Sequence, residues 1–339
     1  MHDSSVGALT RHAVRRLQDR PIVEAGAVPG YGPLFNAGVL HHAGAYHLFV
    51  RAVRNGYHPG DGTGARFVDY VSDIVIFTSA DGERYEYGYV LASAGTGGAL
   101  CYEDPRVQWV EDRGRRRLVM TYTHVPRPGN GPWRIGAHRL RWDRGRFALV
   151  EATGQLLGPP DVADKDGVVF TLSDGRVALI HHVRSGMQLA LFEDLEHLWH
   201  PPDDYWDVHL ADLASHTLLL PSPGALGIGV GAPPVRSAAG LLLFFHERRA
   251  DGSYTMNLAL LDEATGRVRT RLPEPVLEPE LDWERAGDVD DVVFVQGAHL
   301  AGDDIYLTYG AADRCVGAAV ASVPRLLDAL AAAGREQVV

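Results

Sequence analysis

Acidic, basic and amide side chains recur at the start of short apolar segments spread over most of the 339-residue chain. In chain order these starts are Asn36, Glu103-Asp104, Lys165-Asp166 and Asp290-Asp291, and Gly231 occupies the corresponding point of the fourth unit. Carboxyl groups act as general acids and bases, and a pair of them flanks the scissile bond in enzymes that cleave glycosides. A single Asp at such a point is explained by an Asx turn entering a strand. Recurrence along the chain instead favours one shared site for a hydroxyl-rich substrate such as a sugar.

The elements that must position these residues are short strands joined by turns. The apolar segments are rich in Val, Ile, Tyr and Phe, and turn dipeptides such as Asp174-Gly175 and Asp251-Gly252 separate them. This composition and punctuation indicate β-hairpins. The stretch at about 323–334 differs, because Pro324 suits a first helical turn and the apolar residues after it fall on one helix face.

Comparison of the strands shows a unit of about 65 residues that repeats along the chain. The middle strands of the five units lie at 45–51, 117–122, 177–182, 241–246 and 304–309. Such a repeat predicts an all-β, five-bladed β-propeller that forms a single domain over residues 1–339. We expect an N-terminal extension at about 1–20 and a short C-terminal helix. In a propeller the innermost strands converge, so the polar residues that open each unit would line one central funnel.

Composition excludes several classes of function. The chain has 32 Lys and Arg against 43 Asp and Glu, a net charge of −11, which argues against a nucleic-acid partner. No apolar run is long enough to span a bilayer, and the polar N-terminus has no signal-peptide core. We therefore expect no membrane partner. With only two cysteines, Cys101 and Cys315, we also expect no disulfide framework and a cytoplasmic protein.

The segment 197–209 combines histidines and aspartates with Trp199, Tyr205 and Trp206. Its spacing offers no helical His pair or Cys partner, so we predict no metal site here. We expect a polar loop over the funnel, with aromatic rings available to stack on a sugar.

Five segments, taken in order, match the motifs of one known family. They are 36–52, Glu103-Asp104-Pro105-Arg106, 165–170, 229–234 with Phe245-His246, and 287–313. In these segments, over roughly residues 21–330, the chain resembles glycoside hydrolase family 130, the β-mannoside phosphorylases and β-mannosidases. The Glu-Asp-Pro-Arg motif is the most specific of the five, and the fold that the resemblance implies is a five-bladed propeller.

The resemblance implies an inverting phosphorylase that transfers mannose from a β-mannoside to phosphate and releases mannose 1-phosphate. Asp104 would be the general acid, acting through the sugar's own 3-hydroxyl. The residues implied to bind substrate are Asn36, Arg51, Glu103, Asp166, His246, Tyr309 and Asp313. Those implied to bind phosphate are Arg106, Lys165, His181 and His182. The resemblance implies a small oligosaccharide as the partner and inorganic phosphate as the co-substrate, and it implies no cofactor. It also allows a homo-oligomer.

Three departures from the family pattern keep a second activity open. His182 and Thr123-His124 stand where phosphorylases usually carry Arg, and Asp290-Asp291 replaces Pro-Asn. An added carboxylate would serve an inverting β-mannosidase, which needs a base roughly 6.5–9.5 Å from the acid to activate water. Asp291 is the first candidate for this base and Glu247 the second. A non-catalytic sugar-binding propeller is the third hypothesis, disfavoured because a pure binder has no need of the intact acid motif.

Overall fold

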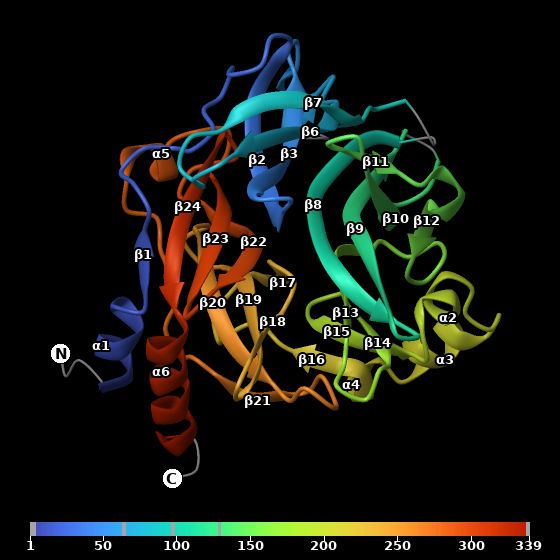
Figure 1. Cartoon of the computed structure of the whole chain (residues 1–339), viewed down its shortest axis with the longest axis vertical. Helices are drawn as coiled ribbons and strands as arrows, with labels where there is room; N and C mark the ends of the chain where they lie inside the picture. Colours follow the sequence, from blue (N-terminus) through green and yellow to red (C-terminus); the bar gives the residue numbers. More distant parts are fainter. Residues whose placement is uncertain (1–4, 63–65, 96–98, 128–129, 337–339) are drawn as a thin grey trace.

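Antiparallel sheets of short strands make up most of the chain. The computed structural model describes residues 5–62, 66–95, 99–127 and 130–336. The sheets are arranged around a ring, with each innermost strand turned toward the centre (Figure 1). The first two blades form one nine-stranded sheet that is joined by a single parallel bridge between Ser72 and Cys101.

The strands of each blade follow one another in the sequence. Blade one comprises β2 (Tyr31–His42), β3 (Ala45–Arg54), β6 (Ser72–Ser79) and β7 (Glu86–Ala92), and its long loop carries β4 (His58–Pro59) and β5 (Phe67–Val68). Blade two comprises β8 (Ala99–Asp112), β9 (Arg115–Pro126) and β10 (Arg134–Asp143). Two short strands, β11 (Arg146–Leu149) and β12 (Gln155–Leu157), both pair with β10. The 3-10 turn η2 (Glu151–Thr153) lies between β11 and β12 in the sequence. Blade three comprises β13 (Lys165–Thr171), β14 (Val177–His182), β15 (Met187–Phe192) and β16 (Thr217–Leu219).

Blade four comprises β17 (Gly227–Val230), β18 (Val235–Ser237), β19 (Gly240–Arg248), β20 (Tyr254–Leu261) and β21 (Val268–Arg271). Blade five comprises β22 (Val293–Ala301), β23 (Asp304–Ala311), β24 (Cys315–Ser322) and β1 (Val14–Arg16). The helices are α1 (Ser5–Arg11), α2 (Leu195–Trp199), α3 (Tyr205–Ala211), α4 (Leu213–His216), α5 (Asp282–Arg285) and α6 (Val323–Glu336). Among the described helices, none has both the length and the apolar character that a membrane span requires.

The apolar core is divided into clusters between neighbouring blades. Successive side chains of a strand point to opposite faces, so each blade contributes to two clusters. On β13, for example, Val168 and Phe170 pack with blade four, whereas Val169 packs with blade two. The innermost strands also contact one another around the ring, from β2 to β8, β13, β17 and, through blade four, β22, which returns to β2. The predicted all-β propeller is therefore confirmed, as is its C-terminal helix α6.

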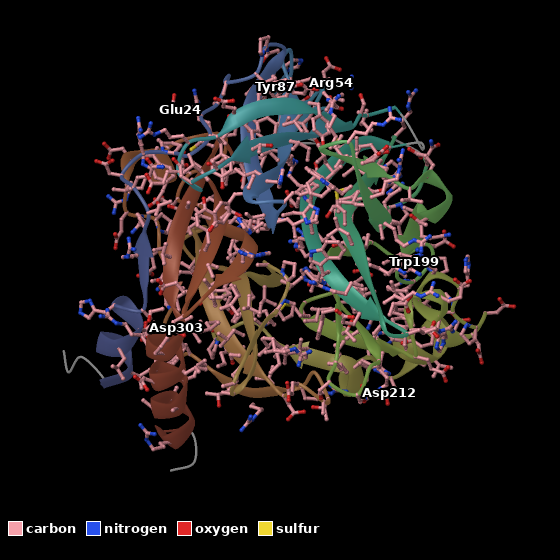
Figure 2. The ribbon with its side chains drawn as sticks, in the orientation of Figure 1. Glu24, Arg54, Tyr87, Trp199, Asp212 and Asp303 are labelled. Carbon is pink, nitrogen blue, oxygen red and sulfur yellow. The ribbon has the colours of Figure 1, made fainter. Side chains whose placement is uncertain are left out.

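The segment between the strands β15 and β16 does not form the loop over the funnel that we expected. It folds into α2, α3 and α4, which lie at the outer rim of blade three, where Figure 2 labels Trp199 and Asp212. Trp206 is buried against Phe192 and Leu195 of the same blade. These rings fill a core between blades two and three, and so they are used for packing.

The strand β1, which we placed in an N-terminal extension, pairs with β24 and completes blade five. Val14 lies opposite Ala321, and Arg16 lies opposite Ala319. Arg16 then reaches the buried carboxylate of Glu284 with two hydrogen bonds of 2.8 and 2.7 Å. The hydroxyl of Tyr309 donates to the same carboxylate at 2.9 Å. Burial alone would raise the pKa of Glu284, but Arg16 and the backbone N–H groups of Glu280 and Leu281 hold that pKa below its usual value.

We predict that Glu284→Ala lowers the free energy of unfolding by about 3–5 kcal/mol, because it leaves Arg16 and the Tyr309 hydroxyl without their buried acceptor. The matched control is Glu280→Ala. Glu280 also pairs with Arg16, but its side chain is 67% exposed, so its loss is expected to cost about 0–1 kcal/mol. Urea unfolding measures both values. Similar losses in the two variants would show that the buried carboxylate does not hold β1.

Candidate active site

Irregularities at the same point of three inner strands place the polar residues of the funnel. The register of β2, β8 and β13 shifts around Asn36, Asp104 and Asp166. All three residues have left-handed backbone angles, with φ of 46°, 52° and 53°. Asn and Asp adopt this conformation more readily than other residues with a side chain, and a bulge redirects the side chain it carries. The repeated local geometry explains why Asn, Asp and Asp recur at the blade starts.

The first cluster forms around the carboxylate of Asp104. Asn36 donates to its Oδ1 at 2.8 Å, and Nη1 of Arg51 donates to the same oxygen at 3.1 Å. Arg51 also donates to Glu103 at 2.5 Å and to the hydroxyl of Tyr70 at 3.0 Å. Within the described part of the chain, Oδ2 of Asp104 has no hydrogen-bond partner, so this oxygen is available to a ligand. Burial raises the pKa of Glu103, although Arg51 opposes that rise.

A second cluster surrounds the buried carboxylate of Asp166. Three groups lie near its Oδ2: Nζ of Lys165 at 3.9 Å, Nδ1 of His182 at 3.7 Å and Nε2 of His246 at 3.9 Å. Burial by itself would raise the pKa of Asp166, but Lys165, His182 and Arg106 hold it well below its usual value. Burial also lowers the pKa of His246 to about 3, which makes this ring neutral. Lys165 is therefore the charged group of this cluster that remains partly exposed.

Arg106 is not placed to bind phosphate, which corrects our prediction for this residue. Its side chain is 1% exposed, and its donors are directed at protein acceptors. Nε donates to the carbonyl of Gly231 at 2.6 Å, and Nη2 donates to the carbonyl of Val230 at 2.8 Å and to Asp166 at 3.1 Å. Nη1 donates to the carbonyl of Asp104 at 3.1 Å. Arg106 thus connects blades two, three and four beneath the funnel.

Two further predictions fail because the side chains of His181 and Tyr309 are buried against other partners. His182 faces Asp166, so His181 must face away from it. The His181 ring is fully buried and contacts Asp164 at 3.0 Å and His209 at 3.1 Å. Tyr309 is equally buried and donates to Glu284, as described above. Neither side chain reaches the two clusters, so the predicted ligand contacts of both are corrected.

Asp313 joins the first cluster from the turn between β23 and β24. The pKa of its carboxyl is raised to about 7, chiefly by burial and then by the nearby carboxylates of Asp104 and Glu103, while Arg51 and Arg66 oppose the rise. The carboxyl is thus poised between its neutral and charged forms near neutral pH. The sequence prediction that Asp313 belongs with Asp104 and Arg51 agrees with these electrostatic contacts.

The candidate bases for a hydrolase are not brought to the acid. Asp291 is exposed, and its backbone carbonyl accepts a hydrogen bond from Tyr254 at 2.8 Å. No contact among the described residues links its carboxylate to Asp104. Glu247 is buried and accepts from the Ser222 backbone and hydroxyl at 2.7 and 2.9 Å, and it pairs with Arg271 at 2.7 Å. Glu247 is therefore fully engaged in anchoring the loop before β17.

Three residues near the funnel were missed by the sequence reasoning. Tyr70 contacts Arg51 through both its hydroxyl and its ring. Arg66 acts electrostatically on Asp313, and Tyr254 interacts with Lys165 and with Asp313. Tyr70 and Arg66 lie in the long loop after β3, where no strand pattern signals their position. Tyr254 is the first residue of β20, which pairs with β19 close to His246. The hairpin pattern of these two strands could therefore have placed Tyr254 near the funnel.

The two clusters give the funnel two chemical halves. Glu103, Asp104 and Asp313 around Arg51 offer several hydrogen-bonding groups and a carboxyl oxygen without a protein partner. Lys165 and His182 form an edge that favours an anion. Among the described residues, no group of His, Cys, Asp and Glu side chains has the arrangement to hold a metal ion. Such a site is suited to binding a sugar beside a small anion.

Comparisons with known proteins agree with this chemistry. The family model described as β-1,4-mannooligosaccharide phosphorylase matches residues 4–332. A β-1,2-mannobiose phosphorylase of Thermoanaerobacter sp. (strain X514) is 30% identical over 85% of this chain and 89% of its own length. A 1,2-β-oligomannan phosphorylase of the same organism is 26% identical over 91% and 96%. The solved β-1,2-mannobiose phosphorylase from Listeria innocua, in complex with β-1,2-mannobiose, superposes with a TM-score of 0.75 at 21% identity, covering 94% of this chain and 99% of that one.

The family model spans nearly the whole propeller, including β1 and most of α6. The chain belongs to glycoside hydrolase family 130, whose members include mannoside phosphorylases.

Proposed function

We propose that the protein is an inverting phosphorylase that transfers mannose from a β-mannoside to inorganic phosphate. The observation that carries this proposal is the placement of Asp104, which has one carboxyl oxygen without a protein partner, near the cation of Lys165 and the imidazole of His182. The names of the relatives support the same reaction, since they are phosphorylases of β-1,2-linked mannosides. Inorganic phosphate is the co-substrate, and no other cofactor is required.

The reaction breaks the bond between the anomeric carbon and the glycosidic oxygen. Protonated Asp104 supplies the proton that reaches the leaving oxygen, by way of the mannose 3-hydroxyl as the family resemblance implies. A phosphate oxygen attacks the anomeric carbon from the opposite face and forms the new bond, which inverts the configuration. The products are mannose 1-phosphate and the shortened saccharide. Asp104 leaves the step as a carboxylate and regains its proton from the medium or from the phosphate product.

The remaining residues of the funnel divide between the two substrates. Arg51 and Asn36 fix the acid by holding its Oδ1, while Glu103 and Asp313 offer hydrogen bonds to mannose hydroxyls. Lys165 supplies positive charge for phosphate, and the His182 ring beside it supplies a nitrogen for hydrogen bonding. Asp166 keeps Lys165 and His182 in place. The free, buried thiols of Cys101 and Cys315 fit a reducing compartment, and we propose the cytoplasm.

The first test is the dependence of turnover on phosphate. In this test β-1,2-mannobiose and β-1,4-mannobiose are each assayed with and without inorganic phosphate. We expect mannose 1-phosphate to form from at least one of them, and only when phosphate is present. The attack requires phosphate as the nucleophile, so its removal should abolish turnover. Release of free mannose at an unchanged rate without phosphate would replace the phosphorylase with a β-mannosidase.

The second test concerns the proton donor. Asp104→Asn keeps the shape of the side chain but removes the acidic proton, so kcat should fall by about 10²–10⁴-fold. Asp303→Asn is the control, since Asp303 is an exposed turn residue next to α6 (Figure 2). Its kcat should equal that of the wild type. An Asp104→Asn enzyme with full kcat would remove the general-acid assignment.

The third test uses the raised pKa of Asp313. Because the pKa of this carboxyl is about 7 in the folded protein and about 3.9 when unfolded, the folded state binds the extra proton between these values. Stability due to this group is therefore highest at low pH and falls as pH rises toward 7. Asp313→Asn, which stays neutral, should raise the melting temperature at pH 8 more than at pH 5. Asp212→Asn, at an exposed position, is the control, and an equal change at both pH values would contradict the shift.

A further inference from the structure

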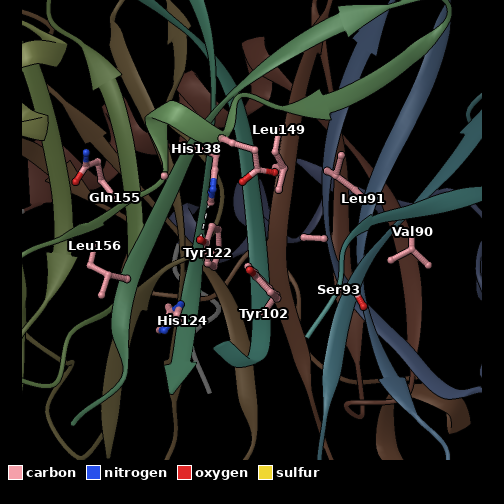
Figure 3. A pocket seen from close by; sticks show the side chains of 13 residues that line it. Val90, Leu91, Ser93, Tyr102, Tyr122, His124, His138, Leu149, Gln155 and Leu156 are labelled. Carbon is pink, nitrogen blue, oxygen red and sulfur yellow. Dashed lines mark hydrogen bonds between the residues drawn. The ribbon is translucent and has the colours of Figure 1, made fainter. Parts of the chain in front are cut away.

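A large groove lies between blades one and two, outside the funnel (Figure 3). We call it the interblade groove, and its volume is ≈ 1030 Å³. It is lined by Val90, Leu91, Ala92, Ser93, Tyr102, Tyr122, His124, His138, Leu149, Glu151, Gly154, Gln155 and Leu156. A second hollow of ≈ 510 Å³ shares Val90, Leu91, Leu149 and Glu151 with it. The two hollows together form an extended depression, which suits a chain-like ligand better than a compact one.

The interblade groove lies behind the strands that carry the acid. Tyr102 of β8 pairs with His124 of β9, and the next pair along these strands is Glu103 with Thr123. Successive side chains point to opposite faces of a sheet. Tyr102 and His124 therefore lie on one face of blade two and Glu103 on the other. None of the residues of the two funnel clusters lines the groove, so a ligand in the groove is a second ligand.

The interblade groove itself has a polar lining with few charged residues, whereas the adjoining hollow is also lined by Asp143, Arg144 and Arg146. Burial lowers the pKa of His124 and of His138, so both rings are neutral near pH 7. Glu151 is the one acidic residue of the ≈ 1030 Å³ lining, which includes no Lys or Arg. A lining without a basic side chain disfavours phosphate, sugar phosphates and nucleic acid. Neutral hydroxyl, amide and imidazole groups beside aliphatic and aromatic surface instead match the alternating polar and apolar faces of a sugar.

Two neighbouring residues form the most specific part of the interblade groove. The hydroxyl of Tyr122 and Nδ1 of His138 lie 3.2 Å apart, and the two rings are stacked. If Tyr122 donates to Nδ1, the His138 proton resides on Nε2 as a donor. A Cβ atom at Gly154 would lie 2.6 Å from this Nε2. Gly154 has ordinary backbone angles, with φ −66° and ψ 118°, so the turn itself does not require glycine. Its missing side chain lets the His138 ring pack directly against the backbone of this turn, so the position of the ring depends on residue 154.

We infer that the interblade groove is a second carbohydrate-binding site, which takes an extended, uncharged manno-oligosaccharide. The class of sugar rests on the proposed function, because it is the substrate that the enzyme would meet. The volume lies at the upper end of the roughly 300–1,000 Å³ that is usual for small-ligand pockets, which leaves room for more than one sugar unit. Binding there would hold a long substrate on the enzyme without occupying the funnel.

The test is the number of oligosaccharide molecules bound per chain. Calorimetric titration of the intact protein with β-1,2-mannotetraose, in phosphate-free buffer, should show two sites in the wild type. Gly154→Ala should place a methyl group against His138, and His138→Ala should remove the donor; each is expected to lose one site or to weaken it at least tenfold. His299→Ala is the matched control, because His299 is a partly buried histidine outside this lining. It should keep both sites.

Initial rates of mannobiose phosphorolysis accompany the titration. Rates within twofold of the wild type in Gly154→Ala and His138→Ala would show that these variants fold and that the funnel is intact. One bound tetraose in the wild type, or two in both groove variants, overturns the inference even when mannobiose is turned over normally. Absence of phosphorolysis in the wild type would instead remove the proposed function, whatever the titration shows.

Discussion

The buried guanidinium of Arg106 is the constraint on which the arrangement of the funnel depends. Removing an arginine from water costs several kcal/mol unless its donors find acceptors. Here the acceptors come from three blades: the carbonyls of Val230 and Gly231, the carboxylate of Asp166 and the carbonyl of Asp104. The same side chain therefore fixes the distance between the acid-bearing bulge of blade two and the bulge of blade three. The Glu103-Asp104-Pro105-Arg106 motif thus contains both Asp104, the proposed acid, and Arg106, which fixes the position of that acid relative to the neighbouring blades.

The electrostatics of the funnel follow from this arrangement. Asp166 is held as a carboxylate by the cations around it, and in turn it orders Lys165 and His182. Around Arg51, by contrast, acidic groups crowd together, and the pKa of Asp313 rises to about 7. A sugar can replace water among such crowded carboxyl groups, because its hydroxyls both donate and accept hydrogen bonds. An anion is favoured only at the Lys165 edge, so the two substrates of a phosphorolysis would be sorted by charge.

Much of the fold could be predicted from the sequence, because hairpin turns and apolar strands repeat at a regular interval and both faces of each blade are buried. The Asn36, Asp104 and Asp166 positions were also predictable, since they occupy equivalent points of the repeat. Side-chain direction was not. Strand alternation forbids His181 and His182 from sharing a face, but which one faces the funnel depends on the register set by the bulge at Asp166. The buried role of Arg106 depends on carbonyls about 125 residues away, and the outward α2–α4 segment depends on packing between blades; neither leaves a local pattern.

The pairing of β1 with β24 has a consequence for how the chain is made. Because β1 is the first described strand and β24 the last, β1 finds its partner only after the last blade has been synthesised, and the ring stays open until then. During that time β1 is an unpaired strand, and unpaired strands can form hydrogen bonds with other chains and aggregate. Its sequence is Val14-Arg15-Arg16, and adjacent positive charges on a very short strand discourage such pairing. The arginine that later locks the finished ring to Glu284 would thus act earlier as a guard against aggregation of the nascent protein.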